Sequence, residues 1–276
     1  CKFVMQILHM GPLAYNDLAV APSPVKSRIG AFAPAELDEA GIEKQIADHA
    51  NCAAMAKKAG YDGVEIIGSA GYLLSTFLVE KTNQRTDKWG GSYENRMRFP
   101  LEVAKRCREA VGDDFIIVFR IAAMDMLQGG ISWDEVAELA RELEKVGVSM
   151  ISTHFTWHES AVPTIATMVP RAAFTSVTGR VRQEVSIPVI TSNRINTPEV
   201  AETVLADGEA DLVSMAHYII QYTTQYNTTP YYTLRYTIVC STLLCPALLN
   251  STLLYSTLLH EDVKAVNTVL DGFAKA

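Results

Sequence analysis

A tyrosine that directly follows a predicted buried strand is the leading candidate for chemistry in this chain. The strand is expected over Gly63 to Ile67, and Gly68-Ser69-Ala70-Gly71 then lets the backbone turn sharply before Tyr72. In α/β folds the carboxyl ends of strands carry the active site. A phenol held there can donate a proton in several classes of reaction. We predict that Tyr72 is a proton donor.

Two histidines follow another predicted strand, Met150 to Thr153, and either could assist the tyrosine. His158 belongs to the loop motif Trp157-His158-Glu159, and His154 precedes it by four residues. An imidazole in this position can hydrogen-bond a substrate carbonyl or help to deliver a proton. A lone loop histidine is more often simply solvated, and the two compete for the role. We predict His158 as the second catalytic residue.

Two polar side chains lie towards the carboxyl ends of otherwise apolar predicted strands, and both could contact a heterocyclic cofactor. Gln6 lies in the predicted strand Val4 to Leu8 and offers a donor and an acceptor, as the pyrimidine edge of a flavin requires. Arg120 ends the predicted strand Phe115 to Arg120 and needs an anionic or polar partner. In a flavin enzyme it would stabilise negative charge on the reduced ring. The alternatives are a structural glutamine and a buried ion pair, for instance between Arg120 and Glu65.

The last two predicted strands are followed by residues that suit a phosphate group. Hydroxyls, backbone amides and a cation come just before a helix that is expected to start at Thr197-Pro198, and the final strand can add further amides. The predicted phosphate contacts are Ser192, Asn193, Arg194, Met215 and Ala216.

Two further cations, Lys81 and Arg171, could bind a polyanionic substrate tail such as the phosphates of coenzyme A, although solvation at the surface is the more common explanation for a single cation. We predict no metal site, because the six histidines show no paired ligand spacing. Cys240 and Cys245 are separated by four residues rather than two, so the cysteines do not support an iron-sulfur cluster. No Walker-type loop or GxGxxG motif precedes a helix, so a dinucleotide would have to dock without a Rossmann domain.

The elements that position these residues follow a βα pattern from Val4 to Ala216. Short apolar runs alternate with segments of helical period, which is typical of a parallel sheet. Besides the four strands already named, we predict strands over Pro188 to Ile190 and Asp211 to Ser214. Six βα steps fit a doubly wound sheet or most of a barrel. The polar and glycine-rich segments all follow strands, and a barrel gathers its sites on that one face.

The composition changes after residue 216, where the motif Ser-Thr-Leu-Leu recurs at Ser241, Ser251 and Ser256. We predict a barrel domain over residues 1–216 and a biased tail over residues 217–276 that ends in an amphipathic helix. Residues 236–259 have the length and low charge of a membrane span, but a proline, an asparagine and many hydroxyls favour a buried or poorly specified helical tail.

Charge and cysteine content limit the class of protein. A net charge of −7 disfavours a general nucleic-acid or anionic-membrane surface and leaves room for a local phosphate pocket. The five cysteines are odd in number, which favours a reducing compartment. No secretory signal opens the chain, and we expect a cytoplasmic location, with residues upstream of Cys1. The oligomeric state stays open.

In these motifs the chain resembles the old yellow enzyme family of flavin oxidoreductases, and within it the flavin barrel of the bacterial 2,4-dienoyl-CoA reductases. The likeness runs from Gln6 to Ala216, and it implies an α/β fold of the (β/α)8 TIM-barrel type, incomplete at its N-terminus because the family's barrel begins two strands before Gln6. It includes the segments 6–11 (QILHMG), 71–73 (GYL), 83–96 (NQRTDKWGGSYENR), 157–159 (WHE), 165–167 (IAT) and 193–196 (NRIN), in that order.

The resemblance implies FMN at the mouth of a (β/α)8 barrel, reduced by NADPH or NADH and reoxidised by an activated alkene, most simply a 2,4-dienoyl-CoA thioester or an enone. Gln6 and Arg120 would contact the flavin ring, and the residues after the last two strands its phosphate. Tyr72 would protonate the substrate, with His158 at the carbonyl. The implied partners are small molecules, with neither nucleic acid nor membrane.

Two departures from the family pattern keep other functions open. Ala70 replaces an acidic residue of the dienoyl-CoA reductases, and His217 stands where the family usually has a phosphate-binding arginine. The main alternative is a catalytically inactive or truncated barrel remnant. A third hypothesis is a flavin-free lyase that uses Tyr72 and His158 as an acid/base pair.

Overall fold

Six parallel strands form the main sheet of the computed structural model, which describes residues 2–161 and 164–215. Their spatial order is the chain order, β1-β4-β5-β6-β7-β8. The strands are β1 (Val4–Ile7), β4 (Gly63–Gly68), β5 (Ile116–Met124), β6 (Met150–Phe155), β7 (Val189–Thr191) and β8 (Leu212–Val213). All six sequence-predicted strands are therefore confirmed.

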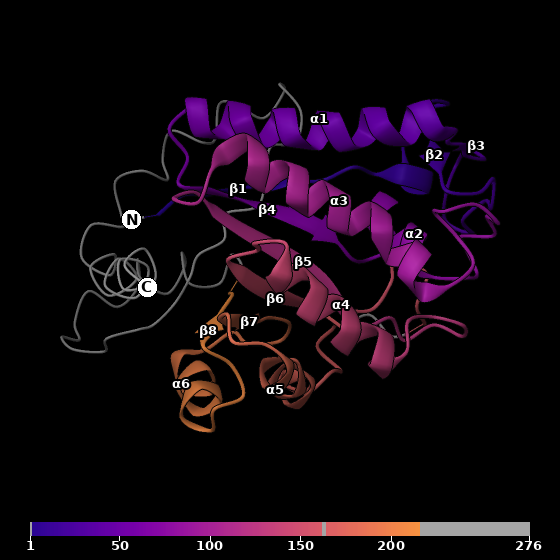
Figure 1. Cartoon of the computed structure of the whole chain (residues 1–276). Helices are drawn as coiled ribbons and strands as arrows, with labels where there is room; N and C mark the ends of the chain where they lie inside the picture. The colour runs from indigo at the N-terminus through magenta and orange to yellow at the C-terminus, as the bar shows by residue number, and fades with distance from the viewer. Residues whose placement is uncertain (1, 162–163, 216–276) are drawn as a thin grey trace, which may run out of the picture.

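Helices follow the strands and cover the outer face of this sheet (Figure 1). They are α1 (Glu39–Lys58), α3 (Tyr93–Val111), α4 (Trp133–Lys145), α5 (Thr175–Glu184) and α6 (Pro198–Ala206). A doubly wound sheet would reverse its strand order at a switch point, and the described strands never do. The sheet is thus built as successive βα units of a barrel, which confirms the predicted fold class.

Two helix starts form as the sequence predicts. Ser132 accepts a hydrogen bond from the Glu135 backbone, and the Glu135 side chain accepts one from Ser132 N–H, which completes the capping box of α4. Thr197 caps α6, whose first residue is Pro198. These local contacts define where the helices begin.

Several elements were not predicted. The segment between β1 and α1 contains the short helix η1 (Gly11–Leu13) and a two-stranded parallel sheet, β2 (Val20–Ala21) with β3 (Ala35–Glu36). Helix α2 (Leu73–Leu78) follows β4 directly. Strand β5 continues beyond Arg120 to Met124 with a register shift, and β6 extends to Phe155, so His154 lies in a strand rather than in a loop.

Alternate side chains of the strands pack in two different environments. Ile117, Phe119 and Ile121 belong to the main core beneath the helices. The intervening positions form a separate small cluster on the opposite side of the sheet: Val4, Val118, Met150, Ile190 and Leu212. In a barrel these are interior positions. The cluster is an apolar layer that closes the interior below the carboxyl ends of the strands.

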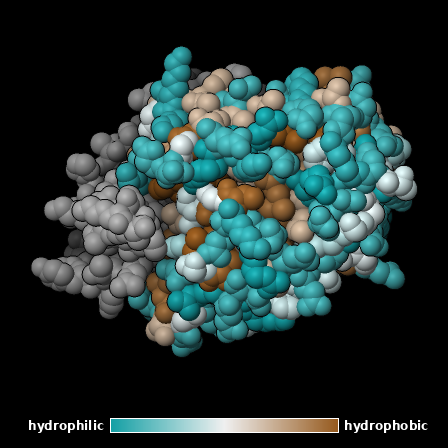
Figure 2. All heavy atoms as spheres, in the orientation of Figure 1, coloured by the Kyte–Doolittle hydropathy of each residue, from teal (hydrophilic) through white to brown (hydrophobic). Residues whose placement is uncertain are grey.

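The outer face is mainly polar. Figure 2 shows hydrophilic side chains over most of the face seen in Figure 1, with a hydrophobic area near its centre. No helix in the described ranges is long and apolar enough to cross a membrane. Ala216 and the predicted tail over residues 217–276, with its terminal helix, lie outside the described residues, and the division into a barrel domain and a tail stays a prediction.

The turn between β4 and α2 requires a glycine at position 71. Ala70 and Gly71 have φ angles of 67° and 90°, in the left-handed region. A Cβ atom added to Gly71 would lie 2.9 Å from the indole ring of Trp157. Trp157 belongs to the loop after β6, so glycine at this position lets the β4 and β6 loops touch.

We expect Gly71→Ala to destabilise the protein more than Gly129→Ala. Both glycines have positive φ, but a Cβ at Gly129 meets nothing within 4 Å. Backbone strain alone should cost Gly129→Ala about 1 kcal/mol. Gly71→Ala should cost about 1–3 kcal/mol more through the clash with Trp157. Urea unfolding of both variants measures the difference, and equal losses of stability would contradict this packing.

The stability should also depend on His9, which follows β1. Burial and the neighbouring His49 lower the pKa of His9 to about 4, so the folded protein keeps it neutral. The unfolded chain binds this proton below pH 6.5, hence the free energy of unfolding falls as the pH drops from 6.5 towards 4. Between pH 6.5 and 4.5, the free energy of unfolding of His9→Gln should therefore fall by about 2 kcal/mol less than that of the unchanged protein. Chemical unfolding at the two pH values tests this; a loss as large as in the unchanged protein would refute it.

Candidate active site

A cavity of about 420 Å³ opens at the carboxyl ends of the barrel strands. The loops and strand ends of β1, β4, β5, β6, β7 and β8 all contribute to it. Its lining includes most of the sequence-predicted site: Gln6, Tyr72, Arg120, His158, Ser192, Asn193, Arg194 and Met215. Ala216 lies outside the described residues. The structure therefore brings together residues that are up to 209 positions apart in the chain.

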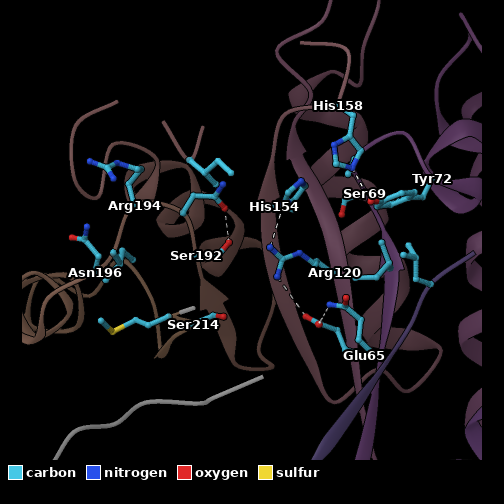
Figure 3. A pocket seen from close by; sticks show the side chains of 18 residues that line it. Glu65, Ser69, Tyr72, Arg120, His154, His158, Ser192, Arg194, Asn196 and Ser214 are labelled. Carbon is cyan, nitrogen blue, oxygen red and sulfur yellow. Dashed lines mark hydrogen bonds and ion pairs between the residues drawn. The ribbon is translucent and has the colours of Figure 1, made fainter. Parts of the chain in front are cut away.

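Figure 3 shows these side chains as two groups that face each other across the cavity. Ser192, Arg194, Asn196 and Ser214 come from the β7 and β8 side. The other group comes from β4, β5 and β6 and the loops that follow them: Glu65, Ser69, Tyr72, Arg120, His154 and His158.

A polar layer lines the base of the cavity directly above the apolar layer of the interior. On five strands it consists of residues two positions beyond the apolar layer: Gln6, Arg120, Ser192 and Ser214, which line the cavity, and Ser152, which contacts Arg120. Glu65 of β4 lies beside Gln6 and also lines the cavity. Gln6 pairs in register with Glu65, and Arg120 with Ser152. Because side chains alternate along a strand, residues two apart share a face. Ser152 was not among the sequence-predicted site residues, although the strand period places it on the same face as Met150.

Tyr72 and His158 form a hydrogen-bonded pair at the rim of the cavity. The Tyr72 hydroxyl lies 2.8 Å from His158 Nε2, and the two rings meet edge to face with centroids 5.1 Å apart. The His158 backbone N–H also donates to the carbonyl of Ala70 at 3.3 Å. This backbone bond and the packing of Trp157 on Gly71 hold the two loops in the position that brings the side chains together.

Burial sets the protonation of this pair. It raises the pKa of Tyr72, with a smaller contribution from Tyr15, so the phenol stays protonated at neutral pH. Burial also lowers the pKa of His158, which is therefore neutral at pH 7. A neutral imidazole with its proton on Nε2 can donate to the phenol oxygen and leave the phenol proton free for another acceptor.

Gln6, Glu65 and Arg120 form a connected group on one wall. Gln6 Nε2 donates to Glu65 Oε2 at 2.5 Å, and Arg120 Nη1 lies 3.8 Å from Glu65 Oε1. The ion pair that sequence analysis held open for Arg120 is present, and yet both side chains also line the cavity.

His154 contacts Arg120 instead of Tyr72. Its Nδ1 lies 3.2 Å from Arg120 Nη2. Burial and the Arg120 charge hold the pKa of His154 well below its usual range. Because a guanidinium only donates, Nδ1 of this neutral imidazole is the acceptor and Nε2 carries the proton. Of the two histidines that sequence analysis left in competition, His158 is the one that reaches Tyr72.

The β7 side of the cavity has a strained backbone. Asn193 and Arg194 have φ angles of 71° and 61°. Such angles are uncommon for residues with side chains and cluster at functional sites. The Ser192 hydroxyl already donates to the Thr153 carbonyl at 2.7 Å. Its side chain is therefore engaged within the protein, and the backbone amides are the groups that this loop can offer.

Arg194 is held over the cavity by the loop after β6. Its Nε donates to the Val169 carbonyl at 2.8 Å, and Nη2 lies 3.5 Å from the Thr167 carbonyl. Both contacts are to neutral carbonyl oxygens, so its charge is not cancelled by them. Asn196 also lines this side, and its buried Oδ1 has no hydrogen-bond partner among the described residues. Asn196 was not among the sequence-predicted site residues.

A second cavity of about 170 Å³ shares Ala70 and His158 with the first. Lys26, Arg28 and Lys81 line it, together with the carboxylate of Glu159, which pairs with Arg28. Lys81 therefore lies where a ligand extending past His158 would reach. Arg171 is exposed and lines neither cavity, so its predicted role as a substrate contact has no support from its position.

Within the described residues, no group of three or more histidine, cysteine or acidic side chains could hold a metal ion. Cys52 and Cys107 are free thiols there, and the other three cysteines lie outside the described residues.

The chain is similar to larger redox proteins. It is 44% identical over 223 residues to a metal reductase of Desulforamulus reducens, covering 79% of this chain and 33% of that protein. It is 38% identical over 229 residues to an NADH oxidase of Thermoanaerobacter brockii, covering 79% and 35% respectively. The chain spans about a third of the length of these curated relatives.

A solved structure of 2-naphthoyl-CoA reductase with 2-naphthoyl-CoA has the same fold. Its TM-score is 0.71 at 32% identity, covering 75% of this chain and 34% of that one. Residues 1–225 match the family described as NADH:flavin oxidoreductase / NADH oxidase. The match covers well over half of the chain, as the motif resemblance to old yellow enzymes predicted. The chain therefore belongs to the NADH:flavin oxidoreductase / NADH oxidase family.

Proposed function

We propose that this protein is an FMN-dependent oxidoreductase that passes hydride from NADPH or NADH to an activated alkene. The observation that carries the proposal is the shared cavity. A hydrogen-bonding wall of Gln6 and Arg120 and the proton-donating pair Tyr72 and His158 line the same space. Chemistry that needs hydride from one source and a proton from another requires both parts together.

The residues present fit FMN. Gln6 and Arg120 would hold the pyrimidine edge of the ring, where an amide and a guanidinium match its donors and acceptors. On the opposite wall, the Asn193 and Arg194 backbone, the Ser214 hydroxyl and the Arg194 charge would hold the phosphate. Glu65 is the only carboxylate in the described lining of the cavity, and it lies with Gln6, away from this wall. When bound, FMN supplies the acceptor and donor of hydride.

Tyr72 would supply the proton to the substrate carbon. His158 would donate from Nε2 to the phenol oxygen and so stabilise the charge that develops as the proton leaves. The relatives include a metal reductase and an NADH oxidase, and neither name specifies an alkene as the acceptor. Reduction of a carbon–carbon double bond needs a proton donor, and the Tyr72 pair favours an alkene as acceptor.

The substrate class that we favour is a 2,4-dienoyl-CoA thioester. A thioester-activated alkene becomes electrophilic when its carbonyl accepts hydrogen bonds, and the Tyr72–His158 pair lies beside the second cavity with its three cations. A solved relative is a reductase of a different acyl-CoA thioester, 2-naphthoyl-CoA. These observations support an acyl-CoA substrate whose tail passes His158.

The test of the proposed function is FMN binding by the purified full chain, followed by single-turnover kinetics. We expect one FMN per chain, bleaching of the flavin absorbance by NADPH or NADH, and its return on addition of a dienoyl-CoA or an enone. A chain that folds but binds no FMN would refute the proposal and favour an inactive barrel remnant.

We expect Tyr72→Phe to separate the two half-reactions. The rate of flavin reduction should stay within about twofold of the unchanged protein, because Tyr72 donates no proton in that step. The rate of alkene reduction should fall about 10²- to 10⁴-fold, the usual contribution of a general acid. Stopped-flow absorbance measures both rates. Equal effects on the two half-reactions would contradict the role of Tyr72.

Lys81→Ala and Arg171→Ala form a matched pair for the substrate tail. Lys81→Ala should raise the apparent KM for a dienoyl-CoA about two- to fivefold, as loss of one exposed ion pair would. It should not change the KM for a small uncharged enone. Arg171→Ala should leave both values unchanged, since Arg171 lines neither cavity. Steady-state kinetics measure these KM values. An equal effect of both variants would show that the coenzyme A tail does not bind at Lys81.

A further inference from the structure

We propose that Glu65 is a positioning residue that orients Gln6 and compensates the charge of Arg120, and thereby sets the relative affinity of the site for oxidised and reduced flavin. This inference rests on the proposed function, because it assumes that the cavity binds FMN.

Glu65 is a buried carboxylate, and one of its oxygens accepts no hydrogen bond among the described residues. It lies in the middle of β4 with 0% of its surface exposed, and it lines the cavity. Oε2 accepts from Gln6 at 2.5 Å, while the buried Oε1 has no hydrogen bond among the described residues. Burial of a carboxylate costs several kcal/mol unless charges and donors offset it. A buried acid at the floor of a cavity is therefore a candidate for a functional role.

The carboxylate determines which end of the Gln6 amide faces the cavity. An ionised carboxylate only accepts hydrogen bonds, so the amide group beside it must be the donor, Nε2. Gln6 Oε1 is then left as an acceptor for a ligand. The pyrimidine ring of a flavin carries an imide N–H, which needs such an acceptor. Without Glu65, either end of the amide could face the cavity.

Glu65 also compensates the charge of Arg120. Among the described residues it is the carboxylate that pairs with this guanidinium, at 3.8 Å. The other two contacts, Ser152 Oγ at 3.4 Å and His154 Nδ1 at 3.2 Å, are with neutral groups. Reduction adds negative charge to the flavin ring. Arg120 favours that charge, and Glu65 opposes it, so the pair together determines how strongly the site prefers reduced flavin.

Glu65→Gln removes the charge and keeps the shape. We expect weaker binding of oxidised FMN, by about tenfold, because the Gln6 amide loses its charged acceptor. The affinity for reduced FMN should stay about the same, because the uncompensated charge of Arg120 offsets the lost hydrogen bond. The ratio of the two affinities should then change about tenfold in favour of reduced FMN, which moves the two-electron midpoint potential by about +30 mV.

Asp125→Asn is the matched control. Asp125 is also buried, at 2% exposure, and its Oδ1 also has no hydrogen bond among the described residues. It lies just beyond β5 and lines neither cavity. Loss of a buried charge alone should therefore change stability in both variants, whereas the FMN affinity and the potential should change only in Glu65→Gln.

The experiment uses the full chain loaded with FMN, with dissociation constants from fluorescence titration and potentials from dye-coupled reduction. If the Glu65→Gln variant folds but keeps the FMN affinity and midpoint potential of the unchanged protein, this inference is overturned and the proposed function stays intact. The same shifts in Asp125→Asn would also overturn it. Failure of the unchanged chain to bind FMN refutes the proposed function, and the inference with it.

Glu65→Asp provides a second variant in case Glu65→Gln does not fold. It keeps the charge near Arg120 but withdraws the carboxylate from Gln6. The midpoint potential should stay close to that of the unchanged protein, while oxidised FMN should bind several-fold more weakly. An unchanged FMN affinity in Glu65→Asp would show that Glu65 does not orient Gln6.

Discussion

The candidate site depends on the register of parallel strands around the barrel. Five of the six described strands of the main sheet contribute one interior apolar residue, such as Val118, and two positions later a polar one, such as Arg120. Because the side-chain period of a strand is two, a one-residue slip would turn the whole polar layer towards the helices. The hydrophobic core beneath the helices, which includes Ile117 and Phe119, makes such a slip costly. The packing that stabilises the fold therefore also places the polar groups at the cavity.

The loops above this layer depend on a second contact. Trp157 is buried against Gly71, and the turn at Gly71 has a backbone conformation that favours glycine. This contact joins the loop after β4 to the loop after β6, and it holds Tyr72 within 2.8 Å of His158. Rigid packing of this kind suits a proton donor, because general-acid catalysis requires hydrogen-bond distance to the acceptor.

Electrostatics divide the cavity into two walls. Glu65 and Arg120 pair on one wall, while Arg194 on the other contacts only carbonyl oxygens. His154 and His158 are both neutral, since burial lowers the pKa of each. A ligand with a polar heterocycle at one end and an anionic group at the other matches this distribution. That complementarity, together with the family match over residues 1–225, is the basis for proposing FMN.

Local sequence patterns were sufficient for the strands, for the capped starts of α4 and α6, and for the glycine-rich turn before Tyr72, because these depend on near neighbours in the chain. They also identified most residues that line the cavity. The tertiary structure decided that His158 rather than His154 reaches Tyr72, that Arg171 lines neither cavity, and that Glu65 joins Gln6 to Arg120. Those relations involve residues 55 to 86 positions apart. Only the strand register and the packing between loops bring them within a few ångströms, and neither leaves a local signal in the sequence.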